Sequence, residues 1–143
     1  MAKYGMSMCV LGMAEEYKDQ GIGVNALWPR TSIATAAIEM LAGPESVAHS
    51  RTVEIMSDAA YAILSKNPRN VTGNFFIDDD VLRDEGITDF TSYACVPANA
   101  NKLMPDFFLD DVSNEKSKLW TDWSRHFLCG FWIKYPRFNE QNY

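Results

Sequence analysis

The chain lacks the features by which several classes of protein are recognised. Its only cysteines are Cys9, Cys95 and Cys129, which are widely spaced and form no C-x-x-C pair, so neither a zinc site nor a disulfide framework is expected. Its two histidines, His49 and His126, lie far apart, and we expect no metal site. No run of about 18 apolar residues is present, so no membrane span is expected. The first residues do not resemble a secretory signal.

Basic residues are also too few for a nucleic-acid-binding protein. The chain has 143 residues, with 13 Lys and Arg against 19 Asp and Glu, which gives a formal net charge of −6. A surplus of negative charge repels phosphate backbones and anionic lipids, so neither is expected as a partner. A hydrophobic content of 47% is ordinary for a globular protein, and the length is that of about one domain.

The glycine-rich loop that binds a dinucleotide pyrophosphate is absent too. Such a loop joins a strand to a helix, so that backbone N–H groups at the helix N-terminus meet the phosphates. No G-x-x-x-G-x-G is present, and Gly21–Ala26 matches G-x-G-x-x-A but precedes a strand that ends at Pro29. We therefore reject Gly21–Ala26 as a phosphate loop.

What the chain does contain is an alternation of helical and strand patterns. Apolar spacing and the Gly and Pro stops predict helices and strands in this order: helix 3–18, strand 22–28, helix 35–41, helix 52–65, strand 71–77 and a short helix 81–85. The first helix is apolar nearly all round, which is typical of a helix covered on more than one side. The order is that of an α/β fold with a parallel sheet.

Two strands are too few for such a sheet, so the α/β domain is incomplete in this chain. Residues 1–95 carry the α/β pattern. Residues 96–115 are rich in Pro, Asn and Asp and are predicted to be a linker-like extension. Residues 116–143 are crowded with aromatic residues and have no clear period, so their structure and role stay open.

Three consecutive acids follow the second strand. Asp78-Asp79-Asp80 fits either a cation site or a solvated strand end that caps a helix over Val81–Glu85. Adjacent carboxylates on an extended chain alternate in direction and do not converge on one ion. We therefore favour the solvated strand end.

Several segments together resemble the short-chain dehydrogenase/reductase family, in its second half. Lys3 opens the apolar helix, and the strand that follows leads into the loop 29–35. The resemblance extends to members related to hydroxysteroid dehydrogenases through six segments: Ala2–Met8, Leu11–Glu16, Val24–Pro29, Asp58–Tyr61, Thr72–Phe75 and Pro105–Asp110. The resemblance implies the C-terminal part of a Rossmann-type, doubly wound parallel sheet.

The resemblance also implies site residues. In the family, a Tyr four residues before the Lys exchanges a proton with the substrate, and the Lys lowers the pKa of that Tyr and bonds the nicotinamide ribose. Lys3 is thus implied as a catalytic and cofactor-binding residue, although the Tyr position lies outside this chain. Taken alone, Lys3 fits an exposed helix start better than a catalytic position, and the segments that follow it reverse this preference. Ile33 and Thr35 are implied to hold the nicotinamide carboxamide, and Arg30 stands where the family commonly has Gly.

We therefore expect a fragment or truncated form of an NADP- or NAD-dependent oxidoreductase, inactive alone. Its substrate would be a small, lipid-like molecule, and the chain would self-associate or pair with the missing half of the domain. The resemblance implies a peroxisomal or mitochondrial location, and without a targeting signal a cytoplasmic one stays open. The alternative function is a non-catalytic protein that binds a partner through the apolar helix and the aromatic tail.

Overall fold

The computed structural model describes residues 2–106, which all lie in one compact unit, Met1–Val112. Helices, strands and 3₁₀ turns (η) follow one another along these residues as α1 (Ala2–Glu16), η1 (Lys18–Gln20), β1 (Ala26–Trp28), α2 (Ala36–Ala42), η2 (Pro44–His49), α3 (Glu54–Leu64), β2 (Phe75–Ile77), α4 (Asp78–Asp84), η3 (Thr91–Tyr93) and η4 (Pro97–Asn99).

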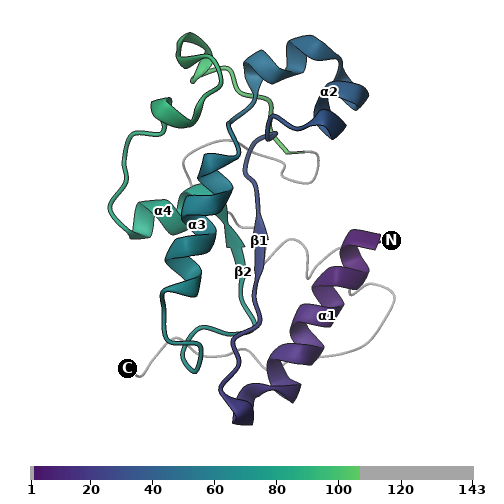
Figure 1. The fold of residues 1–143 in the computed structure, drawn as a ribbon, viewed down its shortest axis with the longest axis vertical. Coiled ribbons are helices and arrows are strands. Elements are labelled where there is room, and N and C mark those ends of the chain that lie inside the picture. Colours follow the sequence, from purple (N-terminus) through teal and green to yellow (C-terminus); the bar gives the residue numbers. More distant parts are fainter. Residues whose placement is uncertain (1, 107–143) are drawn as a thin grey trace, which may run out of the picture. The chain divides into compact units, whose positions relative to one another are not determined.

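The strands β1 and β2 pair in parallel, with α2, η2 and α3 between them in the chain (Figure 1). The register places Ala26 opposite Phe75 and Trp28 opposite Ile77. α3 packs against β1 and α4. This mixed helix–strand arrangement with a small parallel sheet confirms the predicted α/β class.

Both strands are shorter than predicted. The extended segments 22–28 and 71–77 form a ladder only over their last three residues. Before that point a backbone bond, from the N–H of Gly73 to the carbonyl of Val24 at 2.7 Å, stands beside side-chain bonds. Asn25 Nδ2 donates to the carbonyl of Val71 at 3.0 Å, and the N–H of Asn74 donates to Asn25 Oδ1 at 3.1 Å. Gly73 adopts a positive φ of 74°, which no strand residue has. Short polar side chains compete with ladder bonds in this way.

The core forms where α3 meets α4. Ile55, Ala59 and Ile63 recur every four residues on α3 and are buried, because this spacing puts them on one face of the helix. Val81 and Leu82 of α4 complete the buried cluster, and partly buried side chains of β1 and β2 pack against it. The helix predicted over 52–65 is therefore confirmed, but its buried face differs from the one that apolar spacing favoured, because Val53 and Leu64 are 51% and 82% exposed.

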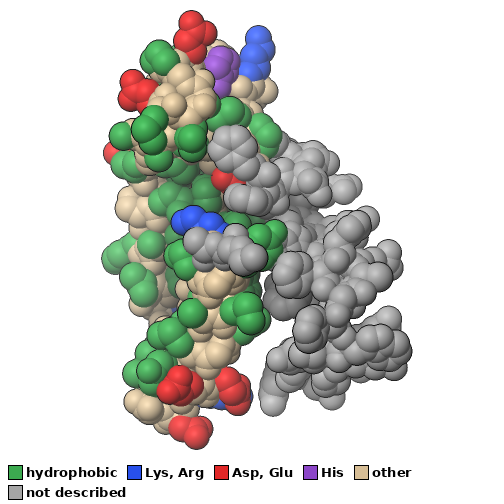
Figure 2. Space-filling view, turned by 90° about the vertical axis from the view of Figure 1, so that its right-hand side faces the viewer, with side chains coloured by type: hydrophobic (Ala, Val, Ile, Leu, Met, Phe, Trp, Pro, Cys, Tyr) green, Lys and Arg blue, Asp and Glu red, His purple; other side chains and the backbone are tan. Residues whose placement is uncertain are grey.

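α1 is largely uncovered by the rest of the described chain. Ala14 is its only buried residue among those with a described side chain, whereas Met6, Met8 and Leu11 are 60%, 72% and 50% exposed. Hydrophobic side chains lie along this face of the molecule (Figure 2). Within residues 2–106 no further strand or helix lies over α1, so the described residues do not meet the expectation that this helix is covered on more than one side.

Residues 99–106 are held against the rest of the unit by hydrogen bonds. The N–H of Met104 donates to the carbonyl of His49 at 2.8 Å, and the N–H of Asp106 donates to the carbonyl of Arg30 at 3.0 Å. A free linker makes no such bonds, so this stretch is docked on the unit.

The remaining predicted segments lie outside the described residues. They are the part of the 96–115 extension that follows Asp106 and the aromatic tail 116–143. Their predicted roles stay predictions.

Candidate functional site

The β1 loop, residues 29–35, leaves the carboxyl end of β1 and pairs with Arg51. The N–H of Arg51 donates to the carbonyl of Ser32 at 2.9 Å, and the N–H of Ala34 donates to the carbonyl of Arg51 at 2.8 Å. Together they form an isolated parallel bridge between Ile33 and Arg51. The loop is therefore an ordered segment with a defined direction for each backbone group.

This bridge fixes which way the backbone of Ile33 points. Its bonds use the carbonyl of Ser32 and the N–H of Ala34, so the N–H and C=O of Ile33 face the opposite edge. Within residues 2–106 no hydrogen bond is made to either group of Ile33. In this part of the chain both groups are therefore available to an amide, which needs one donor and one acceptor.

Thr35 ends the loop as the N-cap of α2. Its Oγ1 accepts a hydrogen bond from the N–H of Ile38 at 3.4 Å, and its residue is exposed. A hydroxyl carries one hydrogen besides its acceptor lone pairs, so Thr35 retains a donor for another group.

Lys3 lies on a different element from the two loop residues. It is exposed in the first turn of α1, where its carbonyl accepts a bond from Ser7 Oγ at 3.3 Å. α1 runs opposite to β1, so its first turn points toward the end of the sheet from which the β1 loop emerges (Figure 1). No hydrogen bond or ion pair joins the Lys3 side chain to the loop in the described part of the chain. The structure thus brings Ile33 and Thr35 together but leaves Lys3 apart.

A cluster of buried charges supports the same loop; we call it the charge cluster, and its members are Arg30, Arg51, Arg83, Asp78, Asp79 and Asp80. Its centre is Asp79, which is fully buried. Asp79 Oδ1 accepts from Arg30 Nε at 2.5 Å, while its Oδ2 lies 3.4 Å from Arg51 Nη1 and from Arg83 Nη2. Arg30 and Arg51 are only 5% and 6% exposed. Burial on this scale requires such pairing, because an isolated charge away from water is very costly.

Here the sequence-based interpretation of the three aspartates is wrong. They are the first turn of α4 and not a solvated strand end, and Asp78 and Asp79 have no exposed surface. A helical turn groups neighbouring side chains that an extended chain would separate, so Asp79 and Asp80 both reach Arg30.

The parallel register of β1 and β2 explains why Arg30 and Asp79 lie close together. The same register is the signal from which their ion pair could have been predicted. Trp28 pairs with Ile77, so Arg30 and Asp79 each lie two residues beyond a matched pair. Carboxyl ends of neighbouring parallel strands meet at the same edge of a sheet. An Arg after one strand and an Asp after the next therefore predict an ion pair there.

Asp78 is only partly satisfied within the charge cluster. Its Oδ1 accepts from the N–H of Arg30 at 2.9 Å and from the N–H of Asp79 at 2.8 Å, but its buried Oδ2 has no partner in the structure. Burial raises the pKa of Asp78 from 3.8 to about 6, against the opposing effect of these bonds and of Arg51. The ionised carboxylate is therefore costly at neutral pH.

We expect Asp78→Asn to reverse a pH-dependent loss of stability. Because the folded-state pKa exceeds the unfolded-state one, wild-type stability from this group is complete below pH 3.8 and declines as the pH rises to about 6. The difference between these two pKa values corresponds to about 3 kcal/mol. Relative to wild type, the Asn variant should gain up to that amount between about pH 4 and about pH 7. Urea unfolding across this range measures it, and a constant difference between the proteins would refute the expectation.

A short chain of serine hydroxyls also links the loop to η2. Ser50 Oγ donates to the carbonyl of Ser46 at 2.8 Å, and Ser32 Oγ lies 2.8 Å from Ser50 Oγ. Since a hydroxyl has one hydrogen, Ser32 must be the donor to Ser50. The loop is thus tied to η2 through a side chain as well as through its backbone.

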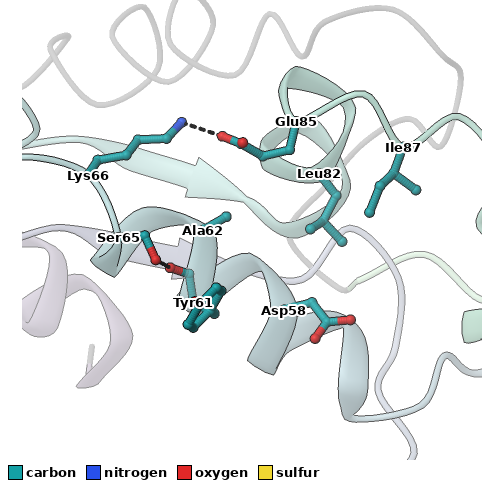
Figure 3. A pocket seen from close by; sticks show the side chains of 8 residues that line it. All are labelled: Asp58, Tyr61, Ala62, Ser65, Lys66, Leu82, Glu85 and Ile87. Carbon is teal, nitrogen blue, oxygen red and sulfur yellow. Dashed lines mark hydrogen bonds and ion pairs between the residues drawn. The ribbon is translucent and has the colours of Figure 1, made fainter.

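A separate open groove of about 460 Å³ lies between α3 and α4 (Figure 3). Leu82, Ala62 and Ile87 line it with apolar groups, and Lys66 Nζ pairs with Glu85 Oε1 at 2.9 Å beside it. None of the sequence-predicted site residues lines this groove.

Two further findings concern the described part of the chain. No group of three or more His, Cys, Asp or Glu residues there is placed to hold a metal ion. No helix within residues 2–106 combines the length and apolar character needed to cross a membrane.

Comparison with curated proteins finds close relatives over most of the chain. It is 58% identical over 111 residues to hydroxysteroid dehydrogenase-like protein 2 of Bos taurus, which covers 78% of this chain and 26% of that protein. The same protein of Danio rerio is 60% identical over 110 residues, and that of Homo sapiens is 54% identical over 118. The chain spans about a quarter of the length of these relatives. No protein-family model matches it.

Solved structures give the same result. A putative dehydrogenase from Xanthomonas campestris is 50% identical, with a TM-score of 0.68 over 75% of this chain and 38% of that one. A short-chain dehydrogenase from Mycobacterium thermoresistibile is 46% identical, with a TM-score of 0.70 over 82% of this chain and 41% of that one. The chain resembles part of a short-chain dehydrogenase. Its small parallel sheet is a portion of that Rossmann-like fold.

This likeness to the short-chain dehydrogenases gives the departure at Arg30 a structural meaning. Where the family commonly has Gly, this chain has a buried side chain that pairs with Asp79 and Asp80. The loop that resembles the cofactor-binding loop is therefore held by a side chain that a glycine cannot supply.

Proposed function

We propose that this chain supplies the nicotinamide-binding half of an NADP- or NAD-dependent short-chain dehydrogenase domain, and that the rest of the domain supplies the pyrophosphate loop and the proton-transferring Tyr. The observation that carries the proposal is the 46% identity to a solved short-chain dehydrogenase over 82% of the chain. The geometry of the β1 loop supports it, because the free N–H and C=O of Ile33 and the hydroxyl of Thr35 suit a carboxamide.

Each residue then has a defined task. The Ile33 backbone and the Thr35 hydroxyl would bind the carboxamide and so orient the nicotinamide ring. Lys3, exposed in the first turn of α1, would bind ribose hydroxyls and stabilise the phenolate of the Tyr. When bound, the cofactor supplies the hydride acceptor or donor. The proposed substrate is a lipid-like secondary alcohol or its ketone, in line with the name of the curated relatives.

The test is a chimera in which the part of the bovine relative that precedes its matched region is joined to the whole 143-residue chain. We expect this chimera to bind NADP or NAD and Lys3→Ala to weaken that binding by about tenfold, because a charged hydrogen-bond donor contributes on the order of 1.5–3 kcal/mol. Titration calorimetry measures both affinities. Lys18→Ala is the matched control, since it removes an exposed Lys from η1. Equal binding by the wild type and Lys3→Ala would refute the role of Lys3.

A peroxisomal or mitochondrial location is part of the same proposal and rests on the likeness alone. Imaging of the natural gene product in its own cells tests it.

A second candidate function is non-catalytic binding of a partner through the apolar helix α1 and the aromatic tail 116–143. The exposure of Met6, Met8 and Leu11 favours it, since soluble proteins seldom leave apolar patches of more than a few hundred Å² uncovered. We expect the isolated chain to associate. Light scattering that shows a stable monomer of about the 16.2 kDa of one chain, with cooperative unfolding, would contradict this expectation.

A further inference from the structure

Arg30 is tied to α4 through both its backbone and its side chain. Its N–H donates to Asp78 Oδ1 at 2.9 Å, its Nε donates to Asp79 Oδ1 at 2.5 Å, and its Nη2 lies 2.6 Å from Asp80 Oδ1. The guanidinium thus spans two consecutive carboxylates of the first turn of α4. Planar, charge-assisted contacts of this kind fix orientation as well as position.

The far side of the β1 loop is tied to other parts of the unit. The N–H of Ser32 donates to the carbonyl of Met104 at 2.9 Å, and the N–H of Ala34 donates to the carbonyl of Arg51 at 2.8 Å. Ile33 lies between Ser32 and Ala34, and Arg30 holds the same loop three residues before Ile33. The direction of its free N–H and C=O therefore depends on contacts at both ends of the loop.

One contact of Arg30, the ion pair with Asp80, can be removed selectively by a single substitution. Asp80 is 33% exposed and makes its described ion pair with Arg30, whereas Asp79 also holds Arg51 and Arg83. Loss of the Arg30–Asp80 contact leaves the centre of the charge cluster in place.

We propose that Arg30 is a positioning residue, held by Asp79 and Asp80, which sets the β1 loop so that Ile33 and Thr35 meet the nicotinamide end of the cofactor. The inference rests on the function proposed above. It predicts that disturbing Arg30 weakens binding of the nicotinamide portion and leaves binding of the adenine portion unchanged.

The experiment uses the chimera described above, with two pairs of ligands. NADP⁺ is compared with 2′-phospho-ADP-ribose, and NAD⁺ with ADP-ribose; each second ligand lacks only the nicotinamide. The variants are Arg30→Lys, which keeps the charge without the planar fork, and Asp80→Asn. Glu85→Gln is the control, because it removes a carboxylate from just beyond α4 that pairs with exposed Lys66.

Of NADP⁺ and NAD⁺, the one that the wild-type chimera binds more tightly should bind about tenfold more weakly to both variants. Binding of the matching ligand without nicotinamide should change by less than about twofold. Glu85→Gln should change neither affinity. Hydrogen exchange at the amides of Ser32 and Ala34 should also become faster in both variants. Unchanged dinucleotide binding, or equal weakening of both ligands, overturns the inference while the proposed function stands. A wild-type chimera that binds neither ligand overturns the proposed function and the inference with it.

Discussion

The purified 143-residue chain is expected to transfer no hydride between a nicotinamide cofactor and any alcohol or ketone. Its sequence contains no Y-x-x-x-K and no G-x-x-x-G-x-G. Acid–base catalysis alone typically contributes about 10²–10⁴-fold to a rate, and the group that would exchange the proton is not in this chain. Nor does the chain contain the loop that would hold the pyrophosphate at a helix N-terminus.

Nicotinamide absorbance, followed with a panel of secondary alcohols and ketones, measures this activity. The control is Lys3→Ala, which removes the residue proposed to be catalytic in this chain. Turnover by the wild-type chain above the Lys3→Ala background would contradict the expectation, because a complete site would then exist within these 143 residues.

A change at the centre of the charge cluster should have the largest effect on folding. Asp79→Asn keeps the size of the side chain but removes the charge that faces Arg30 and Arg51, both nearly fully buried. Breaking a buried ion pair by removing one partner typically costs about 3–5 kcal/mol, because the remaining charge is left uncompensated. We expect a loss of this size in the free energy of unfolding.

Glu85→Gln is the matched control in the unfolding experiment. It breaks the Lys66–Glu85 pair, whose side chains are 39% and 45% exposed, and exposed pairs contribute about 0–1 kcal/mol. Urea unfolding of both variants makes the comparison. If Asp79→Asn lost no more stability than Glu85→Gln, the charge cluster would not stabilise the fold.

The sequence predicted the helices and the class of fold well, because their signals are local. The helix predicted over 52–65 is present as α3, although apolar spacing favoured a face with Val53 and Leu64, which are 51% and 82% exposed. The strands were predicted too long. Asn25 and Gly73 interrupt the ladder through a side-chain bond and a positive φ, neither of which hydrophobic pattern reveals.

The charge cluster could not be seen from local pattern at all. Asp78-Asp79-Asp80 is polar in sequence and suggests a solvated turn, yet Asp79 is fully buried. Its partners Arg30 and Arg51 lie far away in the chain and approach only once β1 and β2 pair in register. Predicting this cluster therefore requires knowing how the two strands pair in three dimensions.

The candidate site residues were predicted from the family resemblance. The structure gives more information about some of these residues than about others. For Ile33 the bridge to Arg51 gives a direction to the backbone groups, which no sequence pattern contains. For Thr35 the structure adds a cap on α2. For Lys3 it adds only exposure at the start of α1, so the role of Lys3 depends on the rest of the domain.

The most direct test of the central claim is a crystal structure of the chimera with NADP⁺ or NAD⁺ bound. The account predicts hydrogen bonds of about 2.7–3.2 Å from the Ile33 backbone and the Thr35 hydroxyl to the carboxamide, and from Lys3 Nζ to the ribose hydroxyls. A cofactor bound with its nicotinamide away from the β1 loop would contradict the account.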